Sequence, residues 1–110
     1  MSPSPPPVPD LGRFAEPSLY ILLSLSDGPK HGYAIMVDVE GVSGTPLGPG
    51  TLYSALARLE ERGLIEALPQ EDRRRPYRLT ALGAATLETQ LERMQGFTRT
   101  ALQRLRRAGS

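Results

Sequence analysis

Hydrophobic residues recur at the helical period in the stretch from Pro49 to Ile65. At this spacing they form one apolar stripe, which a helix buries against a core. Gly48 is an acceptable N-cap, Pro49 suits the first helical position, and Gly63 suits a left-handed C-cap. The pattern therefore predicts an amphipathic helix that begins at Pro49 and ends before Gly63. The stripe consists of Leu52, Ala55, Leu56 and Leu59.

The polar residues of this helix fall on another face, in an arc roughly 80° wide. They are Thr51, Ser54, Arg58 and Arg62. Small hydrogen-bonding side chains and an arginine let a helix approach base edges closely in a DNA groove. An ordinary amphipathic surface helix has the same pattern, so this stretch alone leaves both interpretations open.

Two shorter helices are expected before this one. The apolar run of Glu16–Ser26 predicts the first, and the turn residues of Asp27–Pro29 end it. Apolar positions in Lys30–Glu40 predict the second. The glycine-rich segment Gly41–Gly48 is expected to be a loop.

Two short extended runs follow, Leu64–Leu68 and Tyr77–Thr80, and the polar turn Pro69–Pro76 joins them. They predict a β-hairpin, although the first run is also compatible with a helix tail. Thr80 is a plausible N-cap for a last helix, from Ala81 to about Arg107. Three helices, a hairpin and a long helix are the order of a winged helix-turn-helix, a mainly α fold with a two-stranded β wing.

The last helix would be about 40 Å long, more than a domain of this size can cover. Its apolar seam therefore predicts a partner chain, and we expect a homodimer. The organisation expected is a Pro-rich arm over residues 1–15, a winged-helix domain over 16–80 and a dimerisation helix over 81–110. The residues expected at the dimer interface are Leu87, Leu91, Met94, Phe97, Ala101, Leu102 and Leu105.

Composition narrows the chemistry. The chain has no Cys, which excludes disulfides and thiolate sites, and His31 is its only His. One imidazole supplies neither a metal-ligand set nor a catalytic pair, so we expect no enzyme, no metal and no cofactor. No apolar run approaches the length of a membrane span and no secretory signal is visible, so the expected location is the cytoplasm.

The net charge of +1 by itself argues weakly against nucleic-acid binding, but the distribution of charge is more informative. Basic residues are concentrated in the second half of the chain, with Arg73, Arg74, Arg75 and Arg78 in one cluster. A basic hairpin tip can follow the phosphates of a duplex.

Three motifs in combination resemble the PadR family of bacterial transcription regulators, in particular its short members with one long C-terminal helix. They are His31-Gly32-Tyr33, the run from Pro49 to Ile65, and Tyr77-Arg78-Leu79-Thr80 followed by Gly83. The resemblance covers about residues 16–107. Ser54 stands where the family commonly has Pro, and the wing tip lacks the more usual Gly. The resemblance implies a homodimeric repressor that binds double-stranded DNA at a near-palindromic operator.

The motifs and the basic tip together give the candidate DNA contacts. These are Lys30, His31, Tyr33, Pro49, Thr51, Tyr53, Ser54, Arg58, Arg73, Arg74 and Arg75. Several of them have an ordinary structural alternative. His31 can be purely structural, Tyr33 can be a core residue with a wet tip, Arg58 can pair with Glu61, and the wing arginines can be a solvated tip.

Two further points stay open at this level. A winged-helix module that contacts proteins, without specific DNA binding, is the alternative function. A small-molecule effector could bind between the long helix and the core, with Met94 and Phe97 as candidate lining residues, but a dry packed interface predicts the same sequence. The chain has no Trp, so the ligand binding between Trp side chains that some short PadR-like proteins use does not carry over.

Overall fold

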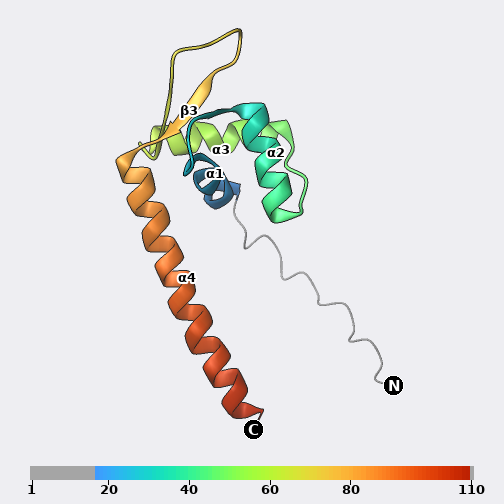
Figure 1. The fold of residues 1–110 in the computed structure, drawn as a ribbon, viewed down its shortest axis with the longest axis vertical. Coiled ribbons are helices and arrows are strands. Elements are labelled where there is room, and N and C mark those ends of the chain that lie inside the picture. The colour runs from blue at the N-terminus through green and yellow to red at the C-terminus, as the bar shows by residue number, and fades with distance from the viewer. Residues whose placement is uncertain (1–16, 110) are drawn as a thin grey trace, which may run out of the picture.

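The structure, a computed structural model, describes residues 17–109 (Figure 1). The Pro-rich arm expected over residues 1–15 lies outside the described residues. The elements in order are α1 (Pro17–Leu25), β1 (Lys30–His31), α2 (Gly32–Ser43), α3 (Pro49–Glu61), β2 (Ile65–Ala67), β3 (Pro76–Leu79) and α4 (Ala81–Ala108).

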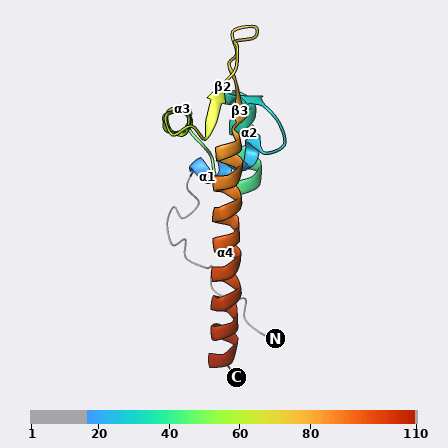
Figure 2. The same cartoon turned by 90° about the vertical axis from the view of Figure 1, so that its left-hand side faces the viewer.

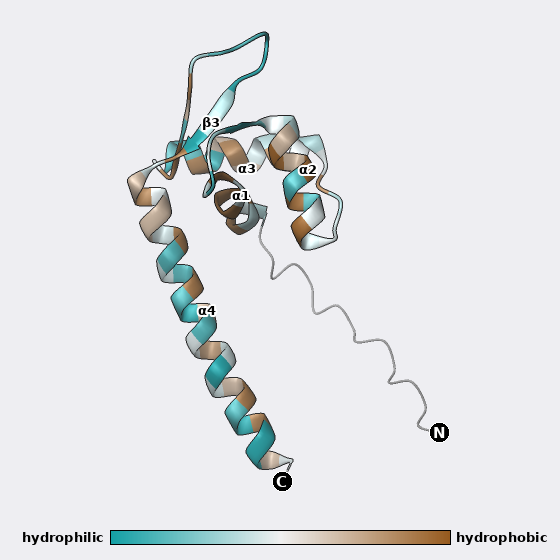
Figure 3. Ribbon diagram, in the orientation of Figure 1, coloured by the Kyte–Doolittle hydropathy of each residue, from teal (hydrophilic) through white to brown (hydrophobic). Residues whose placement is uncertain are grey.

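Helices α1, α2 and α3 pack together, and the β2–β3 hairpin and α4 project from them in opposite directions (Figures 1 and 2). The core lies among the three short helices, and most residues of α1 are hydrophobic (Figure 3). Ile65 from β2 and Leu87 from α4 complete it. The other buried hydrophobic residues are Ile21, Leu22, Leu25, Ile35, Val39, Leu47, Leu52, Ala55, Leu56 and Leu59.

Helix α3 has the predicted boundaries and the predicted buried stripe. Gly48 is its N-cap with an extended backbone, and Pro49 occupies the first turn. At the other end the Gly63 N–H donates to the Glu60 carbonyl and the Leu64 N–H to the Leu59 carbonyl, both at 3.0 Å. Gly63 has a φ of 75°, so the helix ends in a Schellman motif that requires a left-handed residue.

The second helix differs from the prediction at both ends. Lys30 and His31 are extended and form β1, and α2 begins only at Gly32 and continues to Ser43. His31 is the N-cap of α2, with φ −81° and ψ 164°. Because an N-cap residue has β-region backbone, it can pair with a strand just before the helix begins. Two residues are too few to show a strand periodicity in the sequence.

The sheet therefore has three strands, in the order β1-β3-β2, and the prediction of a two-stranded wing was wrong in this detail. Both pairings are antiparallel. His31 lies opposite Pro76 and Lys30 opposite Tyr77. The wing is thus attached directly to the start of α2.

The turn between α2 and α3 is fixed by Glu40. Its carboxylate accepts a hydrogen bond from the Leu47 N–H at 2.9 Å, and its carbonyl accepts one from the Gly44 N–H at 2.9 Å. Leu47 is buried. These contacts hold the segment that leads into α3, and they set where the exposed face of α3 points.

Helix α4 is continuous through Gly96 and begins at the predicted N-cap. The Thr80 hydroxyl accepts a hydrogen bond from the Gly83 N–H at 3.0 Å. Only Gly83 and Leu87 are buried within this helix. Most of its length therefore has no partner among residues 17–109.

Candidate nucleic-acid interface

The exposed face of α3 is the one that the sequence predicted. Thr51, Ser54 and Arg58 are all exposed, as are Pro49 and Arg62, while the apolar stripe is buried. Arg58 forms no ion pair or side-chain hydrogen bond within residues 17–109, so the alternative of pairing with Glu61 is not realised there. The N-terminal two-thirds of α3 thus presents small polar groups and one unpaired cation.

Tyr53 packs against the start of α2. A Cβ added to Gly32 would come within 2.8 Å of the Tyr53 hydroxyl oxygen, closer than real side chains approach. A side chain at position 32 would therefore displace the Tyr53 ring from its contact with the start of α2. The sequence motif His31-Gly32-Tyr33 pointed to this glycine, but only the packing of α3 against α2 shows what it does.

His31 connects α2 to the wing. Its Nδ1 accepts a hydrogen bond from the Ala34 N–H at 3.4 Å, which caps the helix. Its Nε2 lies 3.3 Å from Nη1 of Arg74 in the wing. The only histidine of the chain thus lies where the helix-turn-helix and the hairpin meet.

The wing tip is a tight turn in which Asp72 and Arg73 have φ values of 45° and 66°. Glu71 and Arg74 exchange two backbone hydrogen bonds of 2.7 Å across it. Positive φ at both central residues defines a type I′ turn, which usually contains Asn or Gly. Asp tolerates a positive φ, whereas arginine is not among the residues that favour this backbone conformation.

The turn gives the wing arginines different environments. Arg74 faces His31, whereas Arg75 donates a hydrogen bond to the Leu68 carbonyl at 3.3 Å. Arg73 has no side-chain hydrogen bond or ion pair within residues 17–109. Arg78 pairs with Glu66 across the hairpin. The four arginines of the wing, which look equivalent in the sequence, therefore have different contacts.

Lys30 and Tyr33 also differ from each other in placement. The Lys30 ammonium donates to the Ser24 carbonyl at the end of α1 and pairs with Asp27. This pairing holds the pKa of Asp27 below its usual value. A phosphate contact by Lys30 would have to share or replace these bonds. Tyr33 is 66% exposed, so it is not a core residue.

Tyr77 lies on β3, close enough to α3 for the charge of Glu60 to act on its phenol. Partial burial raises its pKa, and the negative charge of Glu60 raises it further.

Within residues 17–109 no group of His, Asp and Glu side chains is arranged to hold a metal ion, and no helix there is long and apolar enough to cross a membrane.

The exposed side of α4 carries a row of apolar residues. Phe97 is 75% exposed, and the row also includes Leu91, Met94, Leu102 and Leu105, with Ala101 partly buried. Leu87, which the sequence placed at the interface, is only 6% exposed and packs in the core of its own chain, at the edge of the groove beside α4. It anchors α4, and the exposed row begins at Leu91.

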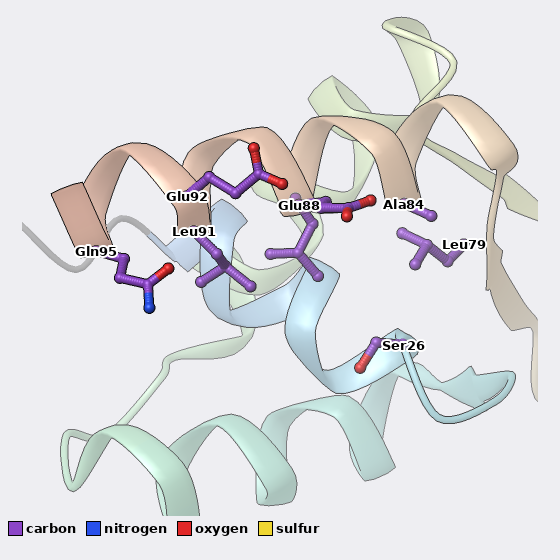
Figure 4. A pocket seen from close by; sticks show the side chains of 8 residues that line it. Ser26, Leu79, Ala84, Glu88, Leu91, Glu92 and Gln95 are labelled. Carbon is purple, nitrogen blue, oxygen red and sulfur yellow. The ribbon is translucent and has the colours of Figure 1, made fainter.

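A groove runs beside α4 where the end of α1 and β3 approach it (Figure 4). Its apolar residues are Leu79, Ala84, Leu87 and Leu91, and its polar ones are Ser26, Glu88, Glu92 and Gln95. Met94 and Phe97, which the sequence suggested as lining residues of a ligand site, are not among them. The groove thus has apolar residues along it and two exposed carboxylates, those of Glu88 and Glu92, on its α4 side.

Comparison with known proteins identifies the family to which the chain belongs. The family described as the transcriptional regulator PadR-like family matches residues 21–89. A 37.1 kDa uncharacterised protein of a Streptomyces fradiae transposon is 46% identical over 82 residues, which is 74% of this chain and 24% of that protein. The chain therefore spans about a quarter of this relative's length.

Solved structures resemble the fold closely. A PadR family transcription regulator from Clostridium difficile has a TM-score of 0.74 and 28% identity, over 81% of this chain and 97% of that one. A transcriptional regulator from Clostridium thermocellum has a TM-score of 0.69 and 29% identity, over 78% of this chain and 86% of that one.

Proposed function

Because the chain belongs to the PadR-like family of transcriptional regulators, we propose that it is a sequence-specific DNA-binding regulator that acts as a homodimer and represses a promoter. The observation that carries this proposal is the exposed face of α3, where Thr51, Ser54 and the unpaired Arg58 lie together. In this role the protein works beside the DNA in the cytoplasm and catalyses no reaction.

In this proposal α3 enters the major groove and its first turns read base edges. Arg58 can donate two hydrogen bonds to guanine, and the hydroxyls of Thr51 and Ser54 can contact neighbouring bases. Pro49 and Tyr53 lie at the approach to the backbone, and Tyr33 is exposed enough to reach a phosphate. The wing arginines and His31 contact phosphates, which position the protein but carry no sequence information.

The exposed apolar row of α4 supports a homodimer, since five large hydrophobic side chains in water are costly without a partner. We propose that two α4 helices pair antiparallel. Glu88 and Glu92 lie near the start of the helix, and Arg104 and Arg107 lie near its end. Antiparallel pairing brings these opposite charges together and seats Leu102 and Leu105 of the second copy along the groove.

This pairing also suits DNA. A 28-residue helix is about 42 Å long, so an antiparallel pair separates the two winged domains by roughly this length. Half-sites one helical turn apart are about 34 to 36 Å from centre to centre. The dimer would therefore match a near-palindromic operator.

A gel-shift titration against the region upstream of the protein's own gene tests the proposal, with a shuffled duplex of the same composition as the control. We expect binding to the upstream duplex at least about a thousandfold tighter at physiological salt. Weak binding that is indifferent to sequence, even at low salt, would contradict it. Absence of DNA binding together with a co-purifying protein would instead favour a protein-interaction module.

The oligomeric state is a separate test. Sedimentation equilibrium should give a dimer, and Leu105→Glu together with Leu102→Glu should shift it to a monomer that remains helical. Thr100→Glu, a charge added at a polar position of the same helix, is the control and should leave the dimer intact. A wild-type monomer at micromolar concentration would refute the antiparallel pairing, and a small-molecule site in the groove would then become the better explanation of it.

A further inference from the structure

A neutral imidazole has one acceptor nitrogen, so His31 can accept from the Ala34 N–H at Nδ1 or from Arg74 at Nε2, but not from both. The tautomer that keeps the helix cap carries its proton on Nε2. Nε2 lies 3.3 Å from Nη1 of Arg74, and a guanidinium has donors only. Neither group can satisfy the other while the helix cap is kept. Both are therefore directed at a place where an acceptor is needed.

The strand register brings these groups together. His31 lies opposite Pro76, and side chains two residues apart on a strand share a face, so Arg74 projects on the same side of the sheet as His31. The type I′ turn at Asp72 and Arg73 sets this register. The meeting of the two donors thus follows from the fold of the wing and from its pairing with β1.

Arg74 has no acidic partner within residues 17–109, so water or a bound anion has to supply the acceptor. The ion pairs within residues 17–109 join Lys30 to Asp27 and Arg78 to Glu66, and neither involves Arg74. An anionic oxygen can accept from the imidazole N–H and from the guanidinium at once, and charge assistance makes both bonds short and strong. In a DNA complex the oxygens available to a wing and a helix N-cap are those of the backbone phosphates.

We propose that His31 Nε2 and the Arg74 guanidinium hold one phosphate of the duplex backbone between them, given the DNA-binding function proposed above, on which this assignment rests. The shared phosphate fastens the wing to the start of α2. Arg73 and Arg75 take no part in it, because Arg75 donates to the Leu68 carbonyl and Arg73, a central residue of the turn, has no hydrogen bond to His31. The wing arginines are then not interchangeable.

A double-mutant cycle tests the shared phosphate. His31→Ser keeps an N-cap acceptor while removing Nε2, and Arg74→Ala removes the guanidinium. Arg73→Gly is the matched control, since it removes the same charge from the same turn and glycine accepts the backbone of that position. Circular dichroism melts first establish that each variant folds. Affinities are then measured by fluorescence anisotropy at several salt concentrations.

The probe is a random-sequence duplex of about three helical turns, because a phosphate contact needs no particular sequence. Loss of one phosphate contact in Arg74→Ala should reduce the salt slope by about 0.9. His31→Ser should weaken binding about tenfold or more when Arg74 is present, the value of one hydrogen bond to a charged group, and less than about twofold when Arg74 is absent. In the Arg73→Gly background its effect should equal that in the wild type.

Equal effects of His31→Ser with and without Arg74 would overturn the shared phosphate. A cycle that is non-additive while the wild type fails to prefer any sequence would leave the shared phosphate standing and remove the specific regulator. An additive cycle together with a strong sequence preference would remove the shared phosphate and leave the specific regulator standing. Inorganic phosphate at millimolar concentration should compete poorly with the duplex. If inorganic phosphate abolished the coupling between His31 and Arg74 without weakening binding otherwise, the site would be a general anion site and not one for backbone phosphate.

Discussion

The Thr80 hydroxyl donates a hydrogen bond to the Gly63 carbonyl oxygen at 2.7 Å, and this bond joins the start of α4 to the end of α3. The Thr80 N–H also donates to the Leu64 carbonyl at 3.1 Å. The helix proposed to read DNA and the helix proposed to form the dimer are thus connected at one corner without a flexible linker. The distance between two α3 helices in a dimer would then depend directly on how the α4 helices pair.

Gly83 makes this corner possible, and its replacement should break it. A Cβ at Gly83 would lie 2.0 Å from the Leu64 carbonyl oxygen, a backbone atom that cannot move aside cheaply. We expect Gly83→Ala to lower the free energy of unfolding by about 3 kcal/mol or more, at the upper end of what overpacking costs. Urea denaturation of the purified variant measures this loss.

Gly96→Ala is the control in the same helix. A Cβ at Gly96 meets nothing within 4 Å, and alanine has the higher helix propensity. This variant should be more stable than the wild type by up to about 1 kcal/mol. Equal effects of the two substitutions would mean that the close packing at Gly83 is absent in solution.

Tyr77 should make the stability depend on alkaline pH. Burial, together with Glu60, raises the pKa of this phenol in the folded protein above the ordinary value of 10.0. The unfolded phenol therefore loses its proton first, and the free energy of unfolding should fall as the pH rises from about 10 through the folded pKa. Below the unfolded pKa the contribution is fully present. Thermal melts between pH 8 and about 11 measure the fall.

Tyr77→Phe keeps the ring and removes the ionisable group, so it should flatten this alkaline loss of stability. Tyr33→Phe, which removes an exposed hydroxyl, is the matched control. If Tyr77→Phe declined as steeply as the wild type, the loss would have to come from another group.

Arg58 and Arg62 lie one turn apart on the same exposed face of α3, which makes them a matched pair. Arg58→Ala should weaken binding to the preferred duplex by about 1 to 3 kcal/mol and relax the preference at one base pair, if it contacts a base. Arg62 is the C-cap, farther from the groove-facing end, and its alanine variant should lose less than about 0.5 kcal/mol. Anisotropy titrations with preferred and shuffled duplexes measure both.

A loss at Arg58 that is equal for both duplexes and reduces the salt slope by about 0.9 would identify a phosphate contact instead of a base contact.

Helix α3 was predictable because local signals agree along it. Pro49, the apolar stripe and Gly63 each specify the same helix and the same boundaries, and the tertiary fold satisfies all of them. The N-cap role of Thr80 was likewise readable, because an N-cap acts within its own turn of helix.

The parts that the sequence did not reveal depend on contacts between distant residues. Strand β1 has two residues and exists only because β3 pairs with it. The difference between Arg74 and Arg75 comes from strand register, which a row of identical residues cannot show. Leu87 fits the α4 seam by spacing, but the packing of α1 against α4 buries it in the core.

Selection of binding sites from a random duplex pool tests the central proposal most directly. The wild-type protein should enrich a two-fold symmetric sequence with half-sites about one helical turn, roughly 34 to 36 Å, apart. Arg58→Ala should enrich the same sequence with one symmetric pair of positions relaxed. A wild-type pool that shows no common sequence after repeated rounds would contradict a sequence-specific regulator that reads DNA through α3.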